Sequence, residues 1–160
     1  MDKNIIHSKS INELLSGMRL KKPTHPLITV IDTEKLAYGE ETVGMRFSSE
    51  LFCIALKDSS CGIDYGRNHY DFDDGVLIFT APDQIITVKK TQELNQVKGW
   101  MLYFHPDLIR KTTLGEKIDS FNFFNYEVNE ALHLSDQEQN VLTQIVELIK
   151  NEIKERIDNH

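Results

Sequence analysis

Short runs of apolar and β-branched residues, separated by polar turn residues, fill the chain from Leu27 to Phe104. Within one run Cys61, Ile63 and Tyr65 alternate with other residues, so they would share one face of a strand. The expected strands are residues 27–32, 42–47, 51–57, 61–66, 69–72, 75–80, 85–90 and 97–104. Many short strands with frequent turns predict a β-sandwich or a β-barrel.

One strongly apolar run is cut short by a proline. Residues 75–80 end at Ala81-Pro82-Asp83, and a second β-like run follows at once. Proline has no N–H group for a strand ladder, so within sheets it is confined to edges, strand ends and bulges. We interpret this stretch as the corner of a small barrel.

Two helices are predicted from their starting signals. Ser10 and Glu13 have the spacing of a capping box, and they precede a short apolar stripe over residues 11–16. Ser135 and Glu138 repeat this spacing before a long run without Gly or Pro. A helix over residues 136–157 would be about 33 Å long at ~1.5 Å per residue.

Apolar residues recur at intervals of three and four along this long helix, nearly to the end of the chain. The stripe is longer than a small barrel needs to cover itself. We therefore expect a two-fold interface between two copies of the chain, with the same patch on both. The side chains expected between the copies are Ile145, Leu148, Ile149 and Ile153. The alternative is that the stripe packs on the outside of its own barrel.

Composition narrows the expected partners. The 160 residues carry 18 basic and 25 acidic side chains, a net charge of −7. An acidic chain without a basic stripe is not expected to bind nucleic acid or a membrane surface by itself. The sequence has neither a long apolar run nor the apolar core of a signal peptide, so the cytoplasm is the expected location. Cys53 and Cys61 are expected to be reduced, buried thiols.

Two segments carry a resemblance to known families. Residues 61–84, CGIDYGRNHYDFDDGVLIFTAPDQ, resemble the second half of a cupin barrel, although Asp74-Gly75 stands where that pattern has Gly-Asp. In cupins the proline marks the point where the strand leaves one sheet. Residues 98–138, KGWMLYFHPDLIRKTTLGEKIDSFNFFNYEVNEALHLSDQE, resemble the sensory domain of AraC-type transcription regulators.

The AraC-type resemblance implies a mainly β fold with C-terminal helices. Residues 1–26 would form an arm with a short helix, and residues 27–104 a cupin-like double-stranded β-helix, also called a jelly-roll barrel. Residues 105–160 would form a helical segment ending in the dimerisation helix. Promoter DNA would be bound only through a C-terminal helix-turn-helix domain that is absent from this chain, so the chain would be the effector half of a longer regulator.

The barrel would bind a small-molecule effector, with a sugar or an aromatic compound as the expected class. Small-molecule sites are concave and mostly apolar. Four aromatic side chains on expected strands are the candidate ligand-binding residues, unless they simply fill the core: Phe47, Tyr65, Phe79 and Trp100.

A metal-dependent cupin enzyme is the main alternative. The sequence pattern of such enzymes resembles H-x-H with a nearby Glu, followed by a further His a few residues past the proline. Residues 46–50 and 83–87 contain no histidine, so no catalytic residue, metal or cofactor is expected. A purely structural dimerisation domain with a filled barrel is a third possibility.

Overall fold

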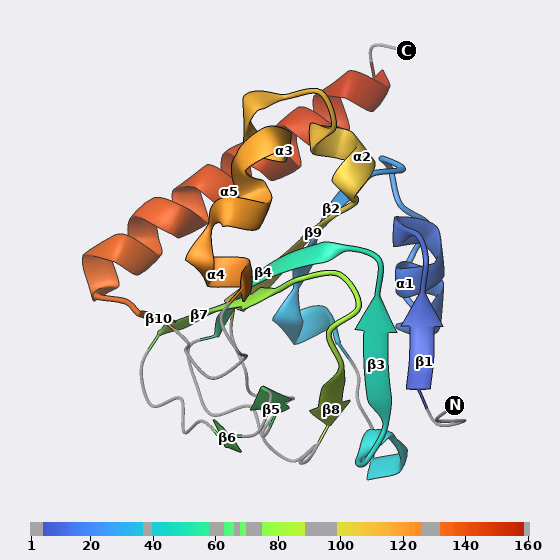
Figure 1. The fold of residues 1–160 in the computed structure, drawn as a ribbon. Helices are drawn as coiled ribbons and strands as arrows, with labels where there is room; N and C mark the ends of the chain where they lie inside the picture. Colours follow the sequence, from blue (N-terminus) through green and yellow to red (C-terminus); the bar gives the residue numbers. More distant parts are fainter. Residues whose placement is uncertain are drawn as a thin grey trace.

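Figure 1 shows the computed structural model, which describes residues 5–36, 40–57, 63–65, 68–69, 75–88, 99–125 and 132–158. The strands are β1 (Ile5–Ser8), β2 (Ile28–Asp32), β3 (Arg46–Ser49), β4 (Phe52–Lys57), β5 (Ile63–Tyr65), β6 (Asn68–His69), β7 (Val76–Thr80), β8 (Ile86–Val88), β9 (Gly99–Phe104) and β10 (Leu132–His133). The helices are α1 (Ile11–Gly17), α2 (Pro106–Ile109), α3 (Thr113–Lys117), α4 (Asn122–Asn125) and α5 (Asp136–Asp158), with 3-10 turns η1 (Thr33–Lys35), η2 (Glu40–Thr42) and η4 (Ile118–Ser120).

The strands form two five-stranded sheets. Sheet A has the order β1-β3-β8-β5-β6, and sheet B has the order β10-β7-β4-β9-β2. From β3 to β9 the chain passes back and forth between them: β3, β5, β6 and β8 belong to sheet A, and β4, β7 and β9 to sheet B. A β-rich fold with a C-terminal helix is therefore confirmed. In the described part of the chain no hydrogen-bonded ladder joins the two sheets into a closed barrel.

The segment around Pro82 is the corner that the sequence predicted. It connects β7 in sheet B with β8 in sheet A, so the chain changes sheets there. Asp83 has a positive φ of 69°, and its N–H donates to the carbonyl oxygen of Ser49 over 2.7 Å. The Ala81 N–H donates to Oε1 of Gln84 over 2.9 Å. These bonds satisfy backbone groups that a continuous strand would have paired in its ladder.

The capping box predicted at Ser10 is complete, and the one predicted at Ser135 is present in its serine half. The Ser10 hydroxyl accepts from the Glu13 N–H over 3.1 Å, and the Glu13 carboxylate accepts from the Lys9 N–H over 2.7 Å. The Ser135 hydroxyl accepts from the Glu138 N–H over 3.2 Å. Side-chain acceptors of this kind satisfy N–H groups that the first helical turn leaves unpaired.

The N-terminal arm and the following loop differ from expectation. The arm contains β1, which pairs in parallel with β3 and was not expected from the sequence. The strand expected over residues 42–47 begins later, because η2 and a turn precede β3. The first difference depends on contacts between segments far apart in the chain, which a local pattern does not encode.

Sheet B is buried on both faces. Its outer face packs against the C-terminal helices, and its inner face packs against α1; Figure 1 shows sheet A on the inner side. The buried outer-face cluster is Phe52, Leu56, Leu77, Trp100, Leu102, Phe104, Ile118, Phe124 and Val146. The buried inner-face cluster is Ile11, Leu15, Ile31, Leu36, Leu51, Cys53, Ala55, Met101 and Tyr103.

Candidate dimerisation and ligand-binding surfaces

Helix α5 lies across the outer face of sheet B (Figure 1). Val146 is 4% exposed and belongs to the outer-face cluster, and Leu142 and Ile149 pack against that cluster. These residues are four and three positions apart, so they form one side of the helix. This side supplies the apolar contact between α5 and its own sheet.

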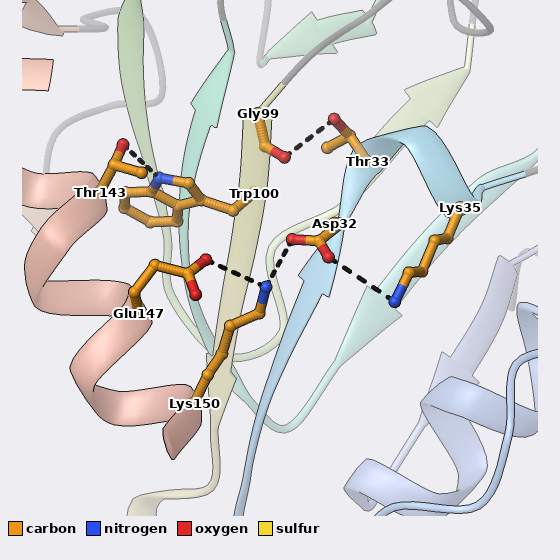
Figure 2. Close-up of polar contacts among 8 residues, drawn as sticks. All are labelled: Asp32, Thr33, Lys35, Gly99, Trp100, Thr143, Glu147 and Lys150. Carbon is orange, nitrogen blue, oxygen red and sulfur yellow. Dashed lines mark hydrogen bonds and ion pairs between the residues drawn. The ribbon is translucent and has the colours of Figure 1, made fainter. Parts of the chain in front are cut away.

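Polar contacts flank this apolar contact (Figure 2). The Trp100 indole N–H, on β9, donates to the hydroxyl of Thr143 over 3.1 Å. The Lys150 ammonium donates to Asp32 on β2 over 2.9 Å and to Glu147 over 3.2 Å. Burial acts to lower the pKa of Lys150, but its hydrogen bonds to the two carboxylates and their negative charges outweigh burial and raise that pKa above its ordinary value.

A second apolar stripe on α5 is exposed. Val141, Ile145 and Leu148 are 49%, 47% and 68% exposed. They are also four and three positions apart, so they share a side of the helix next to the packed one. The structure places Ile145 and Leu148 where a second copy of the chain could contact them.

The other two residues expected at the dimer interface lie differently. Ile149 packs against its own outer-face cluster, and Ile153 is half-buried. Part of the apolar stripe therefore packs on its own sheet, which was the alternative to a dimer interface. The part with Ile145 and Leu148 remains exposed. Ile149 contacts its own sheet, so it is not part of the candidate interface.

The four candidate ligand-binding aromatics are not brought together. Phe79 stacks on Phe123 with ring centroids 5.0 Å apart, and Trp100 contacts α5, so both lie on the outer face beneath the helices. Phe47 is half-buried on β3 of sheet A. Tyr65 ends β5, and its side chain lies outside the described part of the structure. Phe79 and Trp100 therefore belong to the packed outer-face core, which is the alternative to ligand binding that the sequence left open.

Polar side chains occur on the inner face of sheet B. Burial raises the pKa of the Cys53 thiol to about 12, while a hydrogen bond with Tyr103 and the positive charge of Lys57 act to lower it. Cys53 is a free, buried thiol, as expected, whereas Cys61 lies outside the described residues. Lys57 is itself only 4% exposed. The sequence analysis missed Lys57, although it follows Cys53 and Ala55 at every second position of one strand and so had to share their buried face.

Three of the described histidines, His7, His25 and His105, make hydrogen bonds within the protein. His25 and His105 accept from backbone N–H groups two residues away, and His7 Nδ1 lies 2.7 Å from the hydroxyl oxygen of Ser48. Among the described residues no group of three or more His, Cys, Asp or Glu side chains is placed to hold a metal ion. The described residues also contain no helix with the length and apolar character needed to cross a membrane.

Comparison with protein-family models, curated proteins and solved structures finds no match. The resemblance to AraC-type regulators therefore rests on the sequence motifs alone.

Proposed function

We propose that this domain senses a small molecule and forms dimers as part of an AraC-type transcription regulator. In this proposal the two sheets are the halves of a cupin-like jelly roll. The passage of the chain between the sheets from β3 to β9, with the corner at Pro82, supports that topology. The domain would be a cytoplasmic binding module rather than an enzyme, and promoter DNA would be bound by a separate helix-turn-helix domain.

The exposed stripe on α5 is the observation that carries this proposal. Large apolar side chains in a contiguous exposed patch are typical of interaction sites. Fully burying a leucine side chain contributes about 1.5–3 kcal/mol, and Leu148 is 68% exposed before any association. A two-fold axis would repeat the gain on both copies, and it would match the paired half-sites that such regulators read.

Sedimentation velocity of the wild type and of Leu148→Glu tests the dimer. We expect the wild type to be a dimer and the variant to be a folded monomer, because a carboxylate in an apolar interface costs at least ~2 kcal/mol per copy. The affinity of the dimer should then fall by roughly a hundredfold or more.

The matched control is Asn140→Glu, which adds the same charge at an exposed position on another side of α5. It should leave the dimer unchanged, and circular dichroism should show that all three proteins are folded. A monomeric wild type, or a Leu148→Glu protein that remains the same dimer, would contradict the proposal.

A further inference from the structure

A serine, a histidine and a glutamate meet on sheet A, where β1 pairs with β3. The parallel ladder sets His7 opposite Ser48. One step beyond β3, the Glu50 N–H donates to the Ser8 carbonyl oxygen over 2.9 Å, so the chain stays beside β1 as far as Glu50. His7 and Ser48 are 41 positions apart, so no local sequence pattern could indicate that they meet.

The His7 imidazole contacts both of the other side chains. Its Nδ1 lies 2.7 Å from the Ser48 hydroxyl oxygen, and its Nε2 lies 3.7 Å from Oε1 of Glu50. A carboxylate can only accept hydrogen bonds, so Glu50 favours the tautomer that carries its proton on Nε2. Nδ1 is then the acceptor for the Ser48 hydroxyl. A nucleophile within hydrogen-bonding distance of a base, with a third group beside that base, is the arrangement that activates a hydroxyl.

A small molecule can reach these groups. The His7 and Glu50 side chains are 34% and 45% exposed, and Ser48 is half-buried. Phe47 is paired with Ile86 of β8, so the antiparallel direction brings the preceding residue, Ile85, next to Ser48. Ile85 is 40% exposed. An exposed apolar side chain beside the hydroxyl suits a short aliphatic acyl group.

We infer that Ser48 is a nucleophile that takes a short acyl group from an activated ester, with His7 as its general base and Glu50 as a positioning residue. The Ser48 Oγ bonds to the ester carbonyl carbon, and its proton passes to Nδ1 of His7. The Glu50 carboxylate stabilises the imidazolium that forms. The bond from the carbonyl carbon to the leaving oxygen then breaks, and the leaving group takes the proton from His7. The products are acylated Ser48 and a free alcohol or phenol. This reactivity goes beyond the proposed sensing function and does not depend on it.

Acetylation by p-nitrophenyl acetate tests the inference. The protein is quenched in acid after short reaction times, and the acetylated residue is identified by peptide mass spectrometry. Ser49 is the internal control, because strand alternation turns it to the other face and its hydroxyl contacts the backbone of Leu51. We expect an acetyl group on Ser48 well before Ser49. No acetyl group on Ser48, or equal acetylation of Ser49, overturns the inference.

Two histidine variants test the general base. His7→Gln should slow the acetylation of Ser48 by at least about tenfold, because a general base contributes roughly 10²–10⁴-fold. His25→Gln is the matched control: it removes a histidine that contacts only the Leu27 N–H among the printed bonds of its loop, and it should leave the rate unchanged. Circular dichroism should show that both variants are folded. Acetylation of folded His7→Gln at the wild-type rate would contradict the inference.

The role of Glu50 has a spectroscopic readout. Nitrogen NMR of the His7 ring should show the tautomer with its proton on Nε2 in the wild type. Glu50→Ala removes the carboxylate and leaves the backbone N–H that bonds to Ser8. In this variant the share of that tautomer should fall, and the acetylation of Ser48 should slow. An unchanged tautomer together with an unchanged rate would show that Glu50 does not position His7, and would overturn the three-residue arrangement.

Discussion

Replacing Lys150 with Met tests whether ion pairs hold α5 against sheet B. The Lys150 Nζ lies 2.9 Å from Asp32 and 3.2 Å from Glu147, and the Lys150 and Asp32 side chains are 23% and 33% exposed. Hydrogen bonds to charged groups contribute about 1.5–3 kcal/mol, and solvent screening of partly exposed pairs reduces this toward ~1 kcal/mol. Met keeps the aliphatic contacts. We expect Lys150→Met to lower the free energy of unfolding by about 1 kcal/mol near neutral pH.

The pH dependence of this loss has a defined sign. The pKa of Lys150 in the folded protein is raised above its ordinary value of 10.5. The stabilisation is therefore fully present below about pH 10.5 and is lost as the pH rises through the folded-state pKa. The difference in stability between wild type and Lys150→Met should stay constant through neutral and mildly alkaline pH and shrink only in strong alkali.

Urea unfolding followed by tryptophan fluorescence measures both effects. Trp100 is the only tryptophan, and its indole contacts Thr143 on α5, so its emission reports on the same interface. Lys154→Met removes an exposed lysine from the same helix and is the control. If Lys150→Met is no less stable than Lys154→Met near neutral pH, the ion pairs do not hold the helix, and our reasoning is refuted.

Three further outcomes are expected. Gly99→Ala should lower the free energy of unfolding, measured in urea, by at least ~2 kcal/mol. A Cβ at this position would lie 2.0 Å from the Leu56 carbonyl oxygen, and the φ of +147° is unfavourable for alanine. Gly17→Ala is the control and should not be destabilising, because nothing lies within 4 Å of a Cβ there. Cys53 should resist a thiol reagent at mildly alkaline pH until the protein unfolds, because its pKa is raised to about 12; rapid labelling of the folded protein would contradict this. The chain alone should not shift duplex DNA at physiological salt, because its net charge of −7 opposes the phosphate backbone; a sub-micromolar shift with a defined promoter would overturn that expectation.

Local signals allowed the helices and the corner to be predicted. The capping boxes at Ser10 and Ser135 set helix starts through hydrogen bonds within three residues, and the interval pattern over residues 136–157 closely matches α5. Pro82 marked a change of sheet because a missing N–H is a property of the residue itself. Such features survive folding because they depend little on distant contacts.

The faces of the sheet could not be predicted in the same way. Strands β4, β7 and β9 are apolar at nearly every position, so the pattern did not tell which alternate set faces the helices. The sequence therefore did not show that Trp100 and Phe79 face the helices. Lys57 is the only charged residue of β4, and it was the one sequence signal that set its face of the strand apart from the other face. Division of the α5 stripe into packed and exposed halves likewise depends on the angle at which the helix meets the sheet.

Strands β4 and β9 connect the inner-face residue Lys57 with a contact of helix α5. Lys57 is paired in register with Gly99, whose carbonyl oxygen accepts from the Thr33 hydroxyl over 3.2 Å (Figure 2). The next residue is Trp100, which donates to Thr143 on α5. A ligand changes a conformational equilibrium only if it binds one state more tightly than the other. In the proposed sensor, a ligand that altered the β4–β9 pairing at this point would therefore act where α5 contacts its own sheet.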